Sequence, residues 1–212
     1  YPPVRSIVDG SYRALPGQYL AIHTPQFHNV TNWRQIEGIA AAAGARVTSL
    51  DEYLEICRFI FEKWRDAGAV CFKDQSAYER SLAYKLPTRA AAEDVFNRML
   101  ANPRESVAWG ENGHELSDYL VHAFMRMARD LELPVQIHTG HMAGYRNDVT
   151  KANAAHLRIV LETHKDVRFD LFHANWPYAG DLLFLGKNYP NVSINFCWAH
   201  QVDPIYSAKM MA

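Results

Sequence analysis

The stretch Leu133–Trp176, LPVQIHTGHMAGYRNDVTKANAAHLRIVLETHKDVRFDLFHANW, decides the fold expected for this chain. It contains two short apolar runs, Val135–Ile137 and Val167–Phe172, which are typical of buried strands. Each run ends directly in a histidine, His138 and His173 respectively. A glycine-containing loop and a helical pattern separate the two runs. The whole stretch therefore predicts one strand–helix–strand unit.

The helix of this unit is expected from about Thr150 to His164. In a parallel α/β architecture, His138 and His173 then sit at the carboxyl ends of neighbouring strands. Ligands and metals bind at that edge, because strand ends converge there and the loops can vary freely. The two histidines are thus the first candidates for a functional site.

Strand-like and helix-like patterns alternate along the rest of the chain. Ser49–Glu52 has the pattern of a capping box that begins a helix, and Gly68 is placed to end it as a C-cap. Parallel strands are expected near 69–73, 134–138, 167–172 and 192–197, in that spatial order. Two further short strands are expected at Val4–Val8 and Tyr19–Ile22. Further helices are expected at Ile36–Ala45, Thr88–Leu100, Glu115–Leu131 and Tyr178–Lys187.

This alternation predicts a parallel sheet in a single α/β domain over residues 1–212. An open doubly wound sheet and a TIM-type barrel both fit it. The glycine-rich dinucleotide fingerprint, the Walker A loop and the GxSxG elbow are absent from the sequence.

Composition narrows the range of partners. The chain has 212 residues, of which 49% are hydrophobic, so a sizeable core is expected. A formal net charge of -1 without basic runs argues against nucleic acid or an anionic membrane as the main partner. Three widely spaced cysteines suggest buried thiols in a reducing compartment, so we expect a cytoplasmic location. The remaining partners are a small-molecule substrate and a second copy in a homo-oligomer.

Four other histidines have weaker signals. His23 and His28 lie in a loop-like segment and are expected at the surface or in a substrate loop. His114 and His122 are expected at the surface or at a helix end.

Three motifs together resemble the metal-dependent amidohydrolase superfamily: QIHTG at 136–140, FHANWP at 172–177 and NVSINFCW at 191–198. The resemblance is best to its amidohydrolase 2 branch, which includes uronate isomerase-like members, and it covers about residues 50–200. It implies a TIM-type (β/α)8 barrel with the metal at the carboxyl ends of the strands. The strand at 69–73 then matches the fourth of the family, and the strands ending at His138, His173 and Trp198 match the fifth to seventh.

Two departures from the family limit this match. Its first strand carries a His-x-His metal pair that has no counterpart here, and its eighth strand carries a catalytic aspartate that this sequence does not match. A complete barrel also needs about 250 residues. The expectation is therefore an incomplete barrel made of the middle and later strands, with the N-terminal and C-terminal strands missing, which alone holds metal weakly or not at all.

The resemblance implies that His138 and His173 are catalytic metal ligands, for zinc or alternatively manganese. The alternative is that both are core-edge histidines bonded to backbone carbonyls. Lys73 has three alternative roles. Its ammonium would bind an acidic substrate, or the lysine would be carboxylated and bridge two metals, or it would be a solvated lysine paired with Asp74. The other candidate substrate-binding residues are Arg80 and Tyr84, which would contact a carboxylate or sugar acid, and Trp176 and Trp198, which would wall a pocket.

The activity implied is metal-assisted hydrolysis of a small, carboxylate-bearing substrate by activated water. A sugar-acid isomerase or decarboxylase on the same scaffold, and a non-catalytic partial barrel, are the alternatives.

Overall fold

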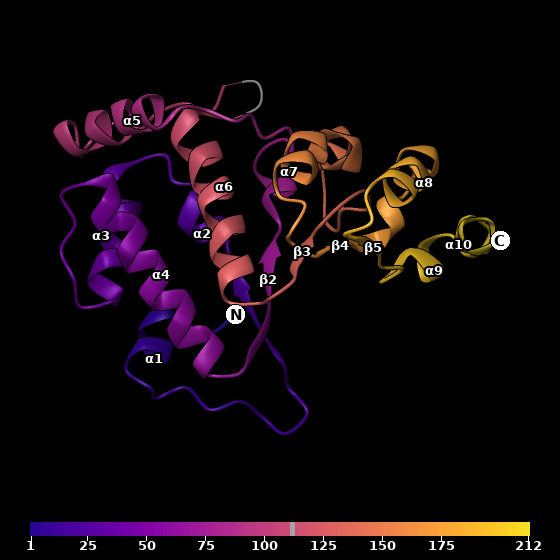
Figure 1. Cartoon of the computed structure of the whole chain (residues 1–212), viewed down its shortest axis with the longest axis horizontal. Coiled ribbons are helices and arrows are strands. Elements are labelled where there is room, and N and C mark those ends of the chain that lie inside the picture. The colour runs from indigo at the N-terminus through magenta and orange to yellow at the C-terminus, as the bar shows by residue number, and fades with distance from the viewer. Residues whose placement is uncertain (111–112) are drawn as a thin grey trace.

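Five short parallel strands form one sheet at the centre of the molecule (Figure 1). The computed structural model describes residues 1–110 and 113–212 of the chain. The strands lie side by side in their sequence order, and each neighbouring pair is parallel. The four predicted strands and their order are thereby confirmed. The strands are β1 (Leu20–His23), β2 (Ala69–Asp74), β3 (Val135–Ile137), β4 (Phe169–Leu171) and β5 (Val192–Ile194).

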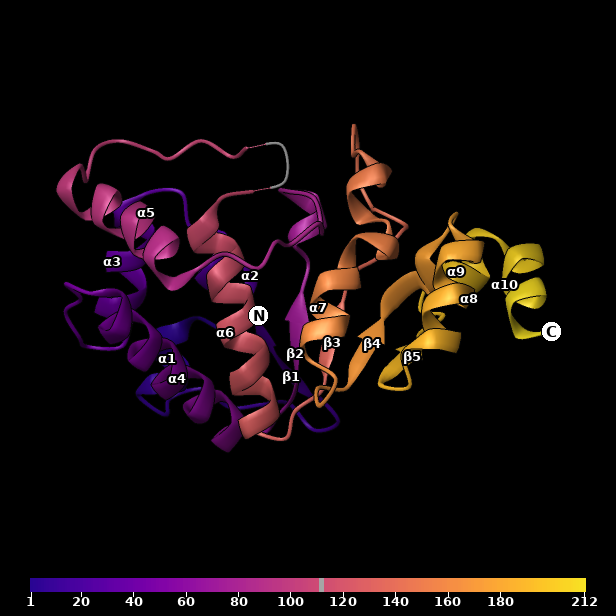
Figure 2. The ribbon, with the colours of Figure 1, turned by 45° about the horizontal axis from the view of Figure 1, so that its top comes forward.

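Helices fill the connections between the strands (Figure 2). Within residues 1–110 and 113–212, no helix combines the length and the apolar character that crossing a membrane requires. The α-helices are α1 (Val4–Val8), α2 (Pro25–His28), α3 (Trp33–Ala42), α4 (Leu50–Asp66), α5 (Arg89–Ala101), α6 (Glu115–Asp130), α7 (Arg158–Thr163), α8 (Ala179–Asn188), α9 (Ala199–Val202) and α10 (Pro204–Met211). The 3-10 helices are η1 (Ser76–Tyr78), η2 (Val149–Ala152), η3 (Ala154–Leu157) and η4 (Phe172–Asn175).

The segment Val4–Val8 was predicted as a strand, and this prediction is wrong, because the segment forms α1. Its apolar residues Val4, Ile7 and Val8 follow the i, i+3, i+4 spacing of one helical face, and all three pack against the core. Pro3 stands at the N-cap, where its missing N–H costs nothing.

The continuous helix predicted from about Thr150 to His164 is also wrong in part. The chain forms η2 and η3 first, and only then the single regular helix α7. Asn153 separates the two short helices, because its backbone is extended and its side chain accepts a hydrogen bond from the Ala155 N–H at 3.0 Å. Asparagine favours such local caps over a helix interior.

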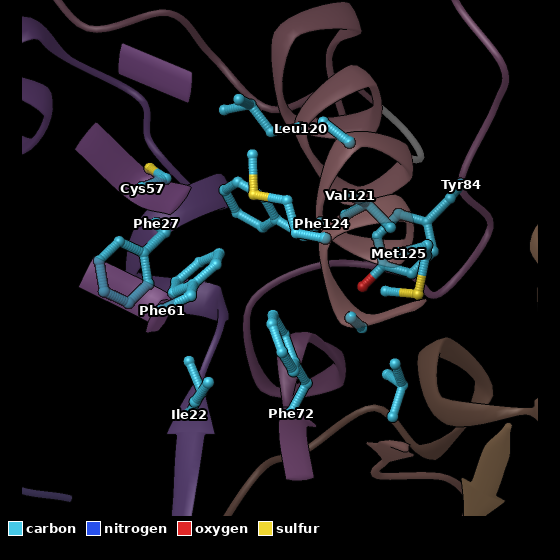
Figure 3. Close-up of a cluster of buried hydrophobic side chains, with 14 of the residues drawn as sticks. Ile22, Phe27, Cys57, Phe61, Phe72, Tyr84, Leu120, Val121, Phe124 and Met125 are labelled. Carbon is cyan, nitrogen blue, oxygen red and sulfur yellow. The ribbon is translucent and has the colours of Figure 1, made fainter. Parts of the chain in front are cut away.

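The core between the sheet and helices α4 and α6 is centred on Phe61 (Figure 3). Its ring meets those of Phe27, Phe72 and Phe124 edge to face, with centroids 5.0–5.1 Å apart. Edge-to-face packing of this kind adds to the stabilisation that comes from burial alone. It joins β2 to α2, α4 and α6 and so fixes the carboxyl end of β2.

The opposite face of the sheet carries a row of polar residues. Backbone pairing places one polar residue of each strand in line, and these residues are His23, Lys73, Gln136, Asp170 and Ser193. The residue one position earlier in each strand is apolar, and side chains alternate between the two faces of a strand. The apolar residues therefore face the helices, and Lys73 belongs to the polar face.

Candidate functional site

His138 and His173 lie together at the carboxyl ends of β3 and β4. His138 follows the last residue of β3, and His173 lies in η4 directly after β4. The two rings approach each other with His138 Nδ1 and His173 Nε2 3.2 Å apart. Their outer nitrogens contact backbone carbonyls, His138 Nε2 that of His141 at 2.6 Å and His173 Nδ1 that of Cys197 at 2.6 Å.

These carbonyl contacts determine which nitrogen of each ring carries the proton. A carbonyl oxygen can only accept a hydrogen bond, so a neutral ring donates from its outer nitrogen. The inner nitrogens, His138 Nδ1 and His173 Nε2, are then both unprotonated and face each other with lone pairs. A second hydrogen bond that fixes the tautomer in this way is typical of metal-binding histidines.

A proton shared between the two rings is not the favoured way to relieve this contact. Burial, together with the nearby His173 and Lys73, lowers the pKa of His138 to about 3. Burial also lowers the pKa of His173. Both imidazoles are therefore neutral at pH 7, and two neutral rings with facing lone pairs fit a cation between them.

The backbone at His173 has an uncommon conformation. His173, Ala174 and Asn175 have φ values of 62°, 45° and 52°, in the left-handed region that residues other than glycine rarely occupy. Runs of such residues are typical of functional sites, where the surrounding structure holds them in place.

A cavity of about 290 Å³ opens beside the histidine pair. Its volume is near the lower end for small-molecule sites, so a small ligand fits it. It is lined by Lys73, Gln75, Tyr78, His138, His141, Ala143, Phe172, His173, Cys197 and Trp198.

Lys73 contributes a buried cation to this cavity. Within the described part of the chain, its Nζ has no hydrogen-bond partner and stands 3.1 Å from the centre of the Phe172 ring. Burial lowers the pKa of Lys73 to about 8. The predicted alternative of a solvated Lys73–Asp74 pair is wrong, because Lys73 is buried and Asp74 instead accepts hydrogen bonds from Tyr84 and the Ser76 N–H.

Of the other predicted substrate-binding residues, Trp198 lines the cavity and is 56% exposed. Trp176 does not line it, and its indole N–H donates to Asp203 at 3.3 Å. The structure thus brings Trp198 together with Lys73 and the histidine pair, and it leaves Trp176 at one side.

Arg80 and Tyr84 also lie outside the cavity lining. Arg80 is buried and pairs with Asp118 at 2.7 Å, and the Tyr84 hydroxyl donates to Asp74 at 2.8 Å. Hydrogen bonds hold the pKa of buried Asp74 below its usual range, although burial alone would raise it. Arg80 and Tyr84 therefore belong to a buried polar network behind the end of β2.

Two further histidine predictions are wrong, and one is confirmed. His28 is buried and lies 3.6 Å from Asp74, and His122 is buried against His164 with ring nitrogens 2.8 Å apart. His114 has the predicted helix-end role, because its ring Nδ1 accepts from the Ser117 N–H and caps α6.

Sequence reasoning missed several lining residues, namely Gln75, Tyr78, His141 and Cys197. Each lies within a few residues of a strand end, which is the one signal that would have found them. Tyr78 accepts a hydrogen bond from the Ala143 N–H at 3.1 Å, so the loop after β3 packs against the loop after β2.

The donor set of the histidine pair fits a divalent metal in part. Two nitrogens bound to one zinc ion at tetrahedral angles lie about 3.4 Å apart, close to the 3.2 Å observed. A catalytic zinc has three protein ligands and an open position. No group of three or more His, Cys, Asp or Glu side chains suited to a metal occurs among residues 1–110 and 113–212, so the histidine pair alone falls short of the three ligands that such a site requires.

Comparisons with known proteins place this geometry in a wider context. No family model matches the chain. Protein fluG of Emericella nidulans is 29% identical over 144 residues, which is 61% of this chain and 16% of that protein. A presumed metal-dependent hydrolase from Lactobacillus casei has a similar structure, with a TM-score of 0.64 and 15% identity, over 86% of this chain and 46% of that one.

Two isomerases also have similar structures. Uronate isomerase of Thermotoga maritima aligns with a TM-score of 0.62 and 16% identity, over 83% of this chain and 42% of that one. Glucuronate isomerase of Caulobacter crescentus aligns with a TM-score of 0.59 and 17% identity, over 90% of this chain and 42% of that one. This chain spans less than half the length of these three solved proteins.

The comparisons define the class of fold. The chain has the α/β fold of TIM-barrel proteins, and the predicted fold class is confirmed. Across the described residues the five strands form an open sheet, and the barrel is not closed.

Proposed function

We propose that this chain forms part of a metal-dependent hydrolase site, in which His138 and His173 hold a divalent metal, zinc or alternatively manganese. The observation that carries the proposal is the 3.2 Å approach of His138 Nδ1 and His173 Nε2, together with the carbonyl contacts that assign the protons to the outer nitrogens. Folding alone gains nothing from two lone pairs in contact, whereas a cation between them is bound by both.

A bound divalent metal would supply an activated water and polarise a carbonyl group. The chain's own residues orient the ligands. The backbone carbonyls of His141 and Cys197 hold the two rings by their outer N–H groups, so that both inner nitrogens face the same point.

Lys73 indicates the substrate class. Its ammonium lies in the cavity without a hydrogen-bond partner among the described residues, and an unpaired buried charge is costly. A substrate carboxylate entering the cavity would pair with it. Phe172, Tyr78 and Trp198 would then form the apolar wall around the body of a small carboxylate-bearing substrate.

The proposal gives Arg80, Tyr84 and Trp176 indirect roles. Arg80 and Tyr84 would support the end of β2 through Asp118 and Asp74. They would keep Lys73 in place without touching the substrate.

Zinc binding by the purified chain tests this proposal. Because the described residues supply only two of the three ligands, we expect the wild-type chain to bind zinc weakly, and His138→Ala and His173→Ala to weaken this binding at least tenfold. Equilibrium dialysis at increasing zinc concentrations measures these affinities. His156→Ala is the matched control, because His156 also contacts a backbone carbonyl through Nε2 but is exposed. Equal zinc affinity of wild type and His138→Ala would overturn the proposal.

A sugar-acid isomerase is the second candidate, because two of the similar structures are uronate and glucuronate isomerases. Lys73 would again bind the carboxylate. Assays of the zinc-loaded protein would separate the two reactions, since hydrolysis of an amide or ester releases an acid, whereas isomerisation converts an aldehyde uronate into a ketone of the same mass.

A further inference from the structure

The two loops that carry His138 and His173 are interlocked beyond the ends of their strands. The Thr139 hydroxyl donates to the Phe172 carbonyl over 2.6 Å, so the residues beside the two histidines are bonded directly. Thr139 is fully buried. This bond joins the loop after β3 to the loop after β4, two strands that lie side by side in Figures 1 and 2.

Gly140 brings the two loops into backbone contact. A Cβ at this position would lie 2.3 Å from the Asn175 carbonyl carbon and 2.4 Å from the Trp176 oxygen. Its φ of 63° is also one that glycine adopts without strain. Only glycine therefore permits this approach of the two loops.

Asn175 holds the other side of the contact. Its side chain is fully buried, accepts from the Ala154 N–H at 2.8 Å and donates to the Tyr178 carbonyl at 3.0 Å. These bonds fix the last of the three left-handed residues that begin at His173. Asn175 thereby sets the direction in which the His173 ring leaves the backbone.

Strand pairing alone does not fix the relative position of the His138 and His173 rings. The His138 N–H still bonds to the Asp74 carbonyl at 2.8 Å and so continues the ladder of β2 and β3. His173 lies in the left-handed turn, where the next ladder-like bond runs from the Ala174 N–H to the Asn195 carbonyl. The position of the His173 ring therefore depends on the turn.

We propose that Thr139, Gly140 and Asn175 are positioning residues that set the separation of the His138 and His173 nitrogens. The role of this separation in metal binding rests on the proposed function. The separation itself is a property of the metal-free chain and is tested separately.

The test uses the conservative variants Thr139→Val, Gly140→Ala and Asn175→Asp with two matched controls. Gly44→Ala introduces the same strain at a φ of 71°, but its Cβ would meet nothing within 4 Å. Asn191→Asp removes an amide that donates to two backbone carbonyls near the other end of β4.

The first readout is the nitrogen chemical shifts of the two rings in the metal-free protein at fixed pH. In wild type and both controls, we expect His138 protonated on Nε2 and His173 on Nδ1. In Gly140→Ala and Asn175→Asp, at least one ring should become a mixture of tautomers. Thr139→Val is the mildest variant, so its ring tautomers still test the proposal if the other two variants fail to fold.

The second readout is zinc affinity, which we expect to fall about 10–100-fold in the positioning variants and to stay unchanged in the controls. The proposal would be overturned if all three positioning variants kept the wild-type tautomers. It would also be overturned if the controls changed their tautomers as much as the positioning variants do. If the wild-type rings have the expected tautomers but the protein binds no zinc, the proposed function fails while the positioning role is retained.

Discussion

Lys73→Met is expected to stabilise the chain at neutral pH. Methionine has nearly the length of the lysine side chain and no charge, so it keeps contact with Phe172 while removing a buried ammonium that has no hydrogen-bond partner among the described residues. A stabilising substitution at a cavity residue would show that the native lysine is retained at a cost in stability.

The pKa of Lys73 gives the magnitude. It is about 8 in the folded chain, whereas a solvated lysine, such as that of the unfolded chain, has a pKa of 10.5. At about 1.36 kcal/mol per pH unit, this difference corresponds to about 3 kcal/mol. Between these two values the unfolded chain binds one proton more than the folded chain, so stability rises with pH.

The free energy of unfolding of wild type should therefore rise by about 3 kcal/mol between pH 8 and 10.5, relative to Lys73→Met. The variant should be more stable by about this amount below pH 8, and the difference should vanish above 10.5. Urea denaturation at pH 7 and pH 10.5, followed by circular dichroism, measures both values. Equal or lower stability of Lys73→Met at pH 7 would refute the reasoning.

Three further predictions concern the core and the buried histidines. Phe61→Ala should lower the free energy of unfolding by about 3–5 kcal/mol, while Phe59→Ala, at a side chain that is 40% exposed, should change it far less; urea titration compares them. The free energy of unfolding should fall as the pH falls from about 6.5 toward 4, because burial lowers the pKa of His164 to about 4 and also lowers that of His122, so the unfolded chain binds more protons. A free energy of unfolding that stays constant over this range would contradict this expectation. His114→Ala should lower the melting temperature by removing the cap of α6, at a cost of about 1 kcal/mol, whereas His114→Asn should restore most of it.

The sheet could be predicted because its signals are local. An apolar run, a glycine C-cap such as Gly68 and a capping serine such as Ser49 each depend on a few neighbouring residues. The approach of His138 and His173 could be predicted for the same reason, since each directly follows a strand and the two strands are neighbours.

The details of the site could not be predicted. The atoms that fix the two tautomers are backbone carbonyls, of His141 and Cys197, and any residue type would supply them. The left-handed turn at His173 contains no glycine to signal it. Arg80 follows β2 closely in sequence, but its side chain pairs with Asp118 of α6, a contact that depends on tertiary packing.

The cavity beside His138 and His173 differs from other grooves on the molecule because several features that lower stability lie together in it. A groove of about 830 Å³ beside α3 is larger, yet none of the described residues lining it has a left-handed backbone or a buried unpaired charge. The smaller cavity combines the unpaired Lys73 ammonium, two facing nitrogen lone pairs and the left-handed turn at His173. Each left-handed residue alone costs about 1–3 kcal/mol. Real sequences accept such costs mainly at functional sites, so their concentration in one cavity supports the proposed site, whereas volume alone would have favoured the groove beside α3.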